Sequence, residues 1–277
     1  MNRFTKALLT SAAALTLIFT AAVPASAGPL TPNRGRFAAV GDSYAAGVGN
    51  TPLKHAGTTG RSADAYPVLL AGRDNKVTFL AESGATTKSV MTNQVQGVLP
   101  TTQQITVTVG GNDIGFAKVA LACASPTEAC SVALNNALAA LSALPDDLGA
   151  LLMQLQMRAP EAEIYVTGYP LLFQPKNNAC PALPGYDATT LGAADAGIGL
   201  LNGVIANTAT ALEVEYVDVT GEFAGHGLCD GMNSFIFPPS FFPDGYPNPS
   251  SLHPSAAGQA AYAKAIEETA FHSAAEG

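Results

Sequence analysis

Five short apolar stretches recur along the chain, and turn-forming residues follow most of them. They are residues 37–40, 76–81, 105–109, 163–167 and 214–219. Runs of this length that are rich in valine, isoleucine and phenylalanine are typical of buried strands. Residues 105–109 also alternate between apolar and polar side chains, which is the period of a strand. The pattern therefore predicts five strands.

Helical patterns separate these stretches. We expect helices over residues 61–73, about 85–98, 130–158, 187–212 and 254–271. Ser62 is the expected N-cap of the first, and Pro145 is expected to kink or restart the third. Strands that alternate with helices predict an α/β fold, a three-layer α/β/α sandwich around a five-stranded parallel sheet. Without an internal repeat or linker, residues 28–277 are expected to form a single domain.

Residues that could take part in catalysis follow several of the predicted strands. Ser43 lies in Gly-Asp-Ser, Gly84 in Ser-Gly-Ala and Asn112 in Gly-Gly-Asn-Asp, while His253 precedes the last helix. Each alone fits a turn, a cap or a packed histidine. The carboxyl ends of parallel strands meet at one edge, however, where α/β proteins bind ligands. Together these groups supply the nucleophile, base and oxyanion donors that acyl transfer requires.

The first 27 residues read as a secretory signal peptide rather than as part of the fold. Arg3 and Lys6 form a positive region, residues 7–23 are apolar, and Ala25-Ser-Ala27 is a small-residue cleavage site. An anchor helix is the alternative, but Pro24 and the cleavage pattern follow the apolar run at once. We expect cleavage after Ala27 and a secreted (extracellular) protein. No later segment is expected to span a membrane stably.

The charge argues against nucleic-acid binding, and the cysteines indicate disulfides rather than a zinc site. The formal net charge is −8, and removal of Arg3 and Lys6 would make it −10. Nucleic acid is therefore not an expected partner, because no basic patch is available to displace phosphate counterions. In an exported chain four cysteines indicate two disulfides. Of the three possible pairings we favour Cys123–Cys130 with Cys180–Cys229, and zinc fits poorly because there is no C-x-x-C motif.

The chain resembles the SGNH, or GDSL-type, hydrolases, whose four sequence blocks supply Ser, Gly, Asn and His in this order. The matching residues here are Ser43, Gly84, Asn112 and His253. Further details are similar to the secreted actinobacterial lipase/esterase branch: Gly41-Asp-Ser-Tyr-Ala-Ala-Gly47, Arg61-Ser62, Thr167-Gly-Tyr-Pro170 and Phe223-Ala-Gly-His-Gly-Leu-Cys229. The resemblance implies a flavodoxin-like sheet, no metal and no cofactor. It also implies that Ser43 attacks an ester carbonyl and His253 moves the proton. The N–H groups of Ser43 and Gly84 and the Asn112 amide would form the oxyanion hole.

The sequence departs from that family pattern at two places. Members with a full triad carry aspartate three residues before the histidine, where this chain has Ser250. By resemblance to relatives without that aspartate, the backbone carbonyl of Ser250 is expected to orient His253 in a Ser-His dyad. A distant carboxylate such as Asp244 is the alternative. Relatives also carry a disulfide between positions where this chain has Thr59-Gly60 and Glu82, so that bridge is expected to be absent.

The resulting expectation is a monomeric, secreted carboxylic ester hydrolase. Lipid or fatty-acyl esters, including phospholipids, are the leading substrate class by resemblance. Alternatives are a carbohydrate acetylesterase and a catalytically silent surface-binding protein on the same scaffold. In the Pro/Gly-rich loop 221–252, Phe235, Phe237, Phe241 and Phe242 could wall an acyl-binding cleft or pack on a small core of their own. His55, His226 and His272 are expected to have no catalytic role.

Overall fold

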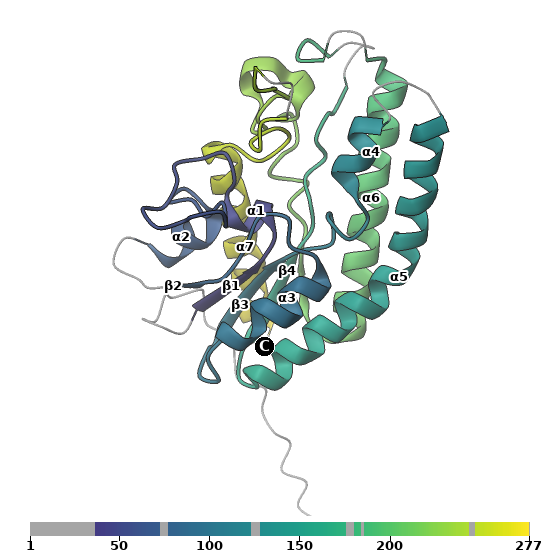
Figure 1. Cartoon of the computed structure of the whole chain (residues 1–277). Helices are drawn as coiled ribbons and strands as arrows, with labels where there is room; N and C mark the ends of the chain where they lie inside the picture. Colours follow the sequence, from purple (N-terminus) through teal and green to yellow (C-terminus); the bar gives the residue numbers. More distant parts are fainter. Residues whose placement is uncertain are drawn as a thin grey trace, which may run out of the picture.

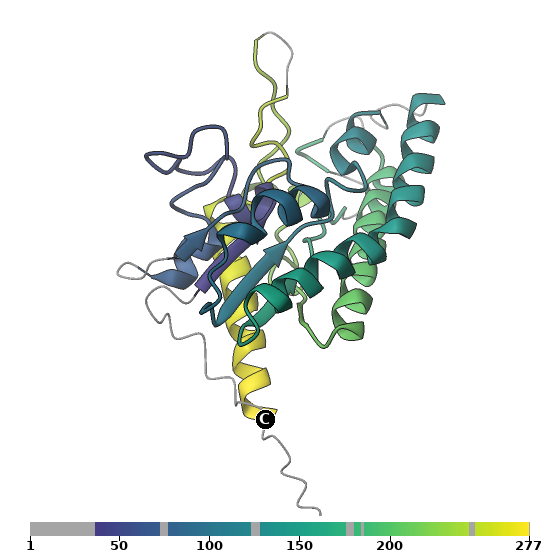
Figure 2. The same cartoon turned by 60° about the horizontal axis from the view of Figure 1, so that its bottom comes forward.

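The protein is a parallel five-stranded sheet with helices on both faces (Figures 1 and 2). A computed structural model describes residues 37–72, 77–122, 128–175, 180–183, 186–243 and 247–276. The strands are β1 (Phe37–Gly41), β2 (Val77–Phe79), β3 (Gln104–Thr108), β4 (Glu163–Thr167) and β5 (Glu215–Val217). Their order is β2-β1-β3-β4-β5. The predicted fold class is therefore confirmed.

The sheet order reverses between β1 and β3, and this position creates a crevice for a site. Chain connections leave β1 and β3 in opposite directions along the sheet, so the loops at their carboxyl ends diverge. The two strands pair in parallel register, from Phe37 opposite Gln104 to Gly41 opposite Thr108. Their carboxyl ends consequently finish side by side. The segments with Ser43 and Asn112 start there.

Two groups of helices sandwich the sheet. On one face lie α2 (Tyr66–Ala71) and α7 (Ala256–Glu276), which pack together. On the other lie α3 (Thr87–Asn93), α5 (Glu128–Arg158) and α6 (Ala188–Ala211). Short elements fill the connections: α1 (Ser43–Ala46), η1 (Val95–Gly97), α4 (Phe116–Ala122) and η2 (Leu228–Asn233). Figure 1 shows the yellow α7 behind the sheet and α3 and α5 in front of it.

The C-terminal half of α5 holds one face of the core. Its leucines recur at helical spacing and are buried against the sheet and its neighbours: Leu144, Leu148, Leu151, Leu152 and Leu155. Each fully buried leucine contributes about 1.5–3 kcal/mol relative to an exposed one. The N-terminal half of the same helix buries none of its residues and extends past the sheet edge (Figure 1).

By length and composition alone, α5 and α6 are long and apolar enough to cross a membrane, which is weak evidence because core helices have the same composition. The two helices pack on each other, and α6 also contacts β4 and β5. Ile198, Leu201 and Ile205 of α6 are buried at that contact. Apolar helices of this kind are ordinary core elements of a sandwich covered on both faces.

Several element boundaries differ from the predictions. The first helix begins at Tyr66 rather than near residue 61, because the Ser62 hydroxyl bonds to the Thr51 carbonyl and accepts from the Asp64 N–H in a turn. The long helix α5 continues through Pro145 instead of restarting there. Figure 1 shows α5 bent along its length. Helix α4 was not predicted.

One of the two predicted disulfides is present in the described part of the chain. Cys180 and Cys229 are bonded, with Cα atoms 4.3 Å apart, and the bridge closes a separation of 49 residues. Backbone bonds from Leu228 to Leu172 and from Cys229 to Phe173 hold the second segment beside the loop after β4. Cys123 lies outside the described residues, so the Cys123–Cys130 pair stays a prediction.

Candidate active site

The chain turns sharply from the end of β1 into α1. Gly41 has φ +139°, and a Cβ there would lie 2.2 Å from the Thr108 carbonyl oxygen, so only glycine allows β1 and β3 to approach so closely. Asp42 then caps α1, and its side chain accepts from the Tyr44 N–H at 2.9 Å. Ser43 follows as the first helical residue and is 8% exposed.

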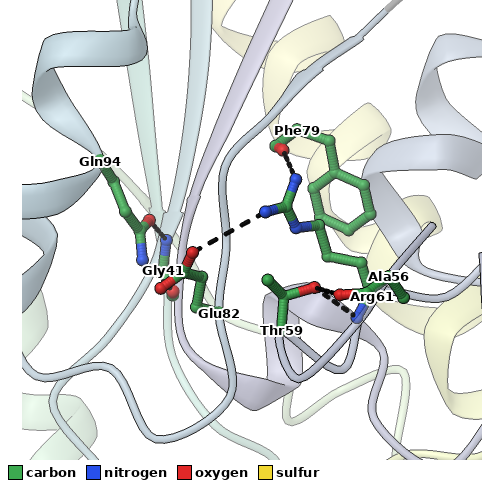
Figure 3. A network of polar contacts seen from close by, with 7 residues as sticks. All are labelled: Gly41, Ala56, Thr59, Arg61, Phe79, Glu82 and Gln94. Atoms are coloured by element: carbon green, nitrogen blue, oxygen red, sulfur yellow. Dashed lines mark hydrogen bonds and ion pairs between the residues drawn. The ribbon is translucent and has the colours of Figure 1, made fainter.

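A buried amide holds the backbone two residues before Ser43. The Gly41 N–H donates to Gln94 Oε1 at 2.8 Å, and Gln94 Nε2 donates to the Gly41 carbonyl at 2.9 Å (Figure 3). The Glu82 N–H donates to the same carbonyl at 3.0 Å. Both polar atoms of the Gln94 amide are hydrogen-bonded in this position, and they fix the end of β1 against the junction of α3 and η1.

Two further buried amides brace the same edge of the sheet. Asn202 accepts from the Tyr169 N–H and donates to the Tyr169 carbonyl, both at 2.8 Å. Gln259 accepts from the Tyr66 N–H at 2.8 Å and donates to the Tyr44 carbonyl at 3.0 Å. The sequence analysis missed these residues. Polar residues on otherwise apolar helical faces were the available signal.

Ser43 and His253 meet across a long sequence separation. The distance from His253 Nε2 to Ser43 Oγ is 2.7 Å, and His253 Nδ1 lies 3.0 Å from the Ser251 carbonyl oxygen. A carbonyl only accepts hydrogen bonds, so Nδ1 carries the proton. Nε2 is then the acceptor, and the Ser43 hydroxyl donates to it. This is the tautomer that a general base needs.

The ring bonds to the Ser251 carbonyl, one residue after the Ser250 carbonyl that was expected to orient it, and the Ser250 carbonyl also acts on the ring. The Ser250 carbonyl accepts the backbone N–H of His253 at 3.0 Å and closes a tight turn. Leu252, inside that turn, has the left-handed value φ +63°. The Ser250 carbonyl thus accepts the His253 N–H, and the Ser251 carbonyl is the closer partner of the ring. The alternative partner, Asp244, lies outside the described residues.

Burial keeps His253 neutral. It lowers the pKa of His253 to about 4 from its ordinary 6.5, although bonding to the Ser251 and Ser250 carbonyls acts in the opposite direction. Desolvation disfavours the charged imidazolium, whereas the carbonyls favour it. The imidazole is therefore unprotonated at neutral pH and can take a proton from Ser43.

Tyr44 contacts the turn that presents His253. Its hydroxyl donates to the Leu252 carbonyl at 2.6 Å, and its ring centroid lies 5.1 Å from that of His253. Because Leu252 has a positive φ, this hydrogen bond fixes a backbone conformation that side chains rarely adopt. Tyr44 thereby links the nucleophile turn to the histidine turn.

Asp42 belongs to the scaffold of the site. The Tyr169 hydroxyl donates to Asp42 at 2.5 Å and accepts from the Gly111 N–H at 3.0 Å. Burial raises the pKa of Asp42 to about 7, while the hydrogen bonds from Tyr169 and Tyr44 lower it. This chain of contacts ties together the carboxyl ends of β1, β3 and β4. Within the described ranges no hydrogen bond joins Asp42 to His253.

The candidate oxyanion donors lie in adjoining loops. Asn112 Nδ2 donates to the Ala85 carbonyl at 2.9 Å, which fixes the Asn112 amide beside the Gly84 loop. Gly84 has φ +79°. Asp113 accepts from the Thr87 N–H and hydroxyl, and this anchors the loop to the start of α3. Among the described residues, the N–H groups of Ser43 and Gly84 have no hydrogen-bond acceptor, so both are available to a ligand.

Polar contacts join the segments around Thr59 and Glu82, where no disulfide was expected. The Ser83 N–H donates to the Thr59 carbonyl at 2.8 Å. Arg61 donates to the Phe79 carbonyl at 2.7 Å and lies 3.8 Å from the Glu82 carboxylate (Figure 3). These contacts join the loop before α2 to the end of β2. The exposed ion pair itself contributes about 0–1 kcal/mol.

The phenylalanines of loop 221–252 are partly packed and partly exposed. Phe235 packs on Phe223 and stacks on His226 with ring centroids 3.7 Å apart, which is a small local core. His226 also bonds to the Asn233 carbonyl at 2.7 Å, in keeping with a structural role. Phe241 and Phe242, by contrast, are 62% and 46% exposed on the hairpin that rises above the sheet edge (Figure 2).

A serine hydroxyl bonded to a neutral imidazole at the carboxyl edge of a parallel sheet defines a serine hydrolase. Residues 39–261 match the model of the GDSL-like lipase/acylhydrolase family, and the chain belongs to that family. It is an ester hydrolase of the lipase/esterase type.

Relatives from Streptomyces resemble it over most of their length. A lipase of Streptomyces rimosus is 33% identical over 228 residues, which is 80% of this chain and 82% of the relative. The crystal structure of an extracellular lipase from the same species superposes with a TM-score of 0.75 at 32% identity. That of phospholipase A1 from Streptomyces albidoflavus NA297 gives 0.75 at 33%. Each match covers 84% of this chain and 98% of the solved chain.

Proposed function

We propose that the protein is a secreted enzyme that hydrolyses fatty-acyl esters of lipids through a Ser43–His253 dyad. The observation that carries the dyad is the 2.7 Å contact between His253 Nε2 and Ser43 Oγ, together with the Nδ1 contact to the Ser251 carbonyl. The lipid class is supported by relatives named lipase and phospholipase A1.

The proposed reaction has two halves. Ser43 Oγ attacks the ester carbonyl carbon while His253 Nε2 takes its proton. The N–H groups of Ser43 and Gly84 and the Asn112 amide stabilise the tetrahedral oxyanion. Collapse breaks the bond to the alcohol, which leaves with the proton from His253. Water then attacks the acyl-enzyme, His253 takes and returns a proton, and the acid leaves with Ser43 restored.

The Ser251 carbonyl takes the place of a triad carboxylate in this proposal. It is an uncharged acceptor, so it fixes the tautomer and ring orientation of His253 without adding a negative charge. In a serine-protease triad, disabling the orienting aspartate costs about 10⁴ in turnover. A carbonyl that holds the same nitrogen avoids the wrong tautomer, which is the main source of that loss.

Covalent labelling tests the dyad. A fluorophosphonate should attach to the peptide that contains Ser43 in the wild type and in Asp244→Ala, and not in Ser43→Ala. His253→Ala should label at least about 100-fold more slowly, because the hydroxyl loses its base. Mass spectrometry of the digested protein reads the site. Slow labelling of Asp244→Ala would replace the dyad by a triad, and absence of labelling in the wild type would favour a silent binding protein.

Secretion is part of the proposal. Its support is the leader pattern, the Cys180–Cys229 bridge and the relative described as extracellular. Expression of the full chain in a Gram-positive host should release a protein into the medium that begins at Gly28. Mass spectrometry of the intact secreted protein checks this, and retention of residues 1–27 on a membrane-bound product would contradict it.

A further inference from the structure

A cavity of about 580 Å³ opens directly beside the oxyanion residue Asn112. The loop of residues 112–115 forms its inner wall, and Lys118 of α4 and the N-terminal half of α5 form the others. Figure 1 shows α4 beside the upper part of α5, at the same end of the molecule as α1. The volume falls within the range of roughly 300–1,000 Å³ typical of small-molecule sites.

The wall has the chemistry of a site for a hydrocarbon chain. Ala129, Ala133 and Ala140 lie four and seven residues apart, so they share one face of α5 and leave room for a ligand. Ile114 and Val132 add apolar surface. Of the charged side chains at the wall, Lys118 and Glu128 are exposed, and Asp113 is half-buried and accepts hydrogen bonds from Thr87. Among the described lining residues none is aromatic, so the stacking platform that a sugar ring favours is missing.

The position of His253 decides which part of an ester enters this cavity. The leaving alcohol must lie at His253 Nε2, because it takes its proton there. His253 precedes α7, which covers the face opposite to α5. With the carbonyl oxygen at the Asn112 amide, the alcohol points toward the α7 side. The acyl chain, on the other side of the carbonyl carbon, points toward α5.

We propose that the cavity between the 112–115 loop, α4 and the N-terminal half of α5 binds the acyl chain of the substrate. This assignment rests on the proposed function and adds a specificity determinant to it. It selects fatty-acyl esters over acetyl esters, because burial of each methylene in an apolar site contributes to binding only when the chain is long enough to reach it.

Matched tryptophan substitutions on α5 test the assignment. Ala133→Trp would fill the cavity, whereas Ala139→Trp places the same side chain at an exposed position of the same helix that does not line it. The readout is the ratio of kcat/KM for p-nitrophenyl decanoate to that for p-nitrophenyl acetate. Ala133→Trp should lower this ratio at least about 10-fold, and Ala139→Trp should leave it within about two-fold of the wild type.

An unchanged ratio in Ala133→Trp, or an equal change in both variants, would overturn the acyl site. A second measurement separates this result from a failure of the catalytic proposal. Isothermal titration of the Ser43→Ala protein with dodecanoate should show binding that Ala133→Trp weakens at least about 10-fold in the same background. Dodecanoate binding without any ester hydrolysis by the wild type would sink the catalytic proposal alone. Absence of binding with normal hydrolysis would sink the acyl site alone.

Discussion

At the scale of single residues, the surroundings of His253 set the pH range in which the site works. The half-buried ring lies between the nucleophile turn and its own tight turn, and only backbone carbonyls contact Nδ1 among the described residues. Without a carboxylate to stabilise it, the imidazolium is disfavoured. A histidine with its ordinary pKa of 6.5 would lose activity below that pH, whereas desolvation of His253 moves this acid limb downward.

Activity should therefore persist to unusually low pH. The pKa of His253 is lowered to about 4 from 6.5, so the base stays unprotonated above about 4 and is lost as the pH falls through that value. We expect kcat/KM for p-nitrophenyl butyrate to be flat from neutral pH to about 5 and to halve near 4. Released p-nitrophenol, measured after samples are brought to alkaline pH, follows the reaction. A limb near 6.5 would show that a negative charge or water reaches the ring.

Tyr44 is the second residue whose effect can be isolated. Tyr44→Phe removes the donor to the Leu252 carbonyl and keeps the ring beside His253. We expect a loss of about 0.5–1.5 kcal/mol in stability and a several-fold lower kcat with an unchanged KM, because the turn that carries His253 is held less firmly. Tyr165→Phe is the control, since it removes a hydroxyl bonded to Glu163 instead. Equal kinetic effects of both changes would contradict a positioning role.

At the scale of elements, the strands were predictable and part of the helices was not. Strands β1 to β5 are short apolar runs stopped by polar or glycine-containing turns, and both signals are local. Helix α4 has no strong start signal in the sequence that precedes it. The early start expected for α2 failed because Ser62 uses its hydroxyl in a turn with Thr51, a contact between residues 11 apart.

Some residues of the candidate site could likewise be predicted from the sequence, and others could not. Ser43, Gly84, Asn112 and His253 could be predicted because their residue types and order carry the chemistry. The Ser251 carbonyl could not, since every residue has one and the backbone of the turn, with a positive φ at Leu252, has no signature in the sequence. Gln94, Asn202 and Gln259 bond to backbone groups 33 to 215 residues away. Such pairings follow from the fold and have no local signature.

The amide of Gln94 offers a test of how α3 and η1 support the nucleophile turn. Gln94→Leu leaves the buried Gly41 N–H without an acceptor, which costs about 1–3 kcal/mol. The carbonyl loses less, because the Glu82 N–H still donates to it. Urea unfolding should show this loss, accompanied by a lower kcat. Gln96→Leu, an exposed neighbour, should change stability by less than about 0.5 kcal/mol. Equal stability of the two variants would refute the support assigned to Gln94.

At the scale of the whole molecule, the site assembles from both faces of the sandwich. The nucleophile and the oxyanion loops leave the central strands, while His253 arrives with α7 from one face and the proposed acyl wall with α5 from the other. Loops at the sheet edge must therefore be held by long-range contacts. The Cys180–Cys229 bridge is the covalent contact of this kind in the described part of the chain.

Removal of that bridge should lower stability more than activity. Closing a loop of 49 residues stabilises the folded chain by about 4 kcal/mol in the chain-entropy account. We expect the Cys180→Ala/Cys229→Ala double variant to lose about that much free energy of unfolding in urea. Its kcat/KM at low temperature should stay within a few-fold of the wild type, because neither cysteine touches the dyad. A loss below about 1 kcal/mol would show that the unfolded chain is already constrained in this region.

The central claim is that Ser43, bonded to His253, is the nucleophile of an ester hydrolase. Hydrolysis of p-nitrophenyl butyrate by purified wild type and Ser43→Ala, with matched circular dichroism and Tm, tests it most directly. The account predicts that the variant folds normally and loses at least about 10⁴-fold in kcat, in line with removal of a triad nucleophile. Equal rates in the two folded proteins would mean that another group performs the attack, and the mechanism proposed above would be wrong.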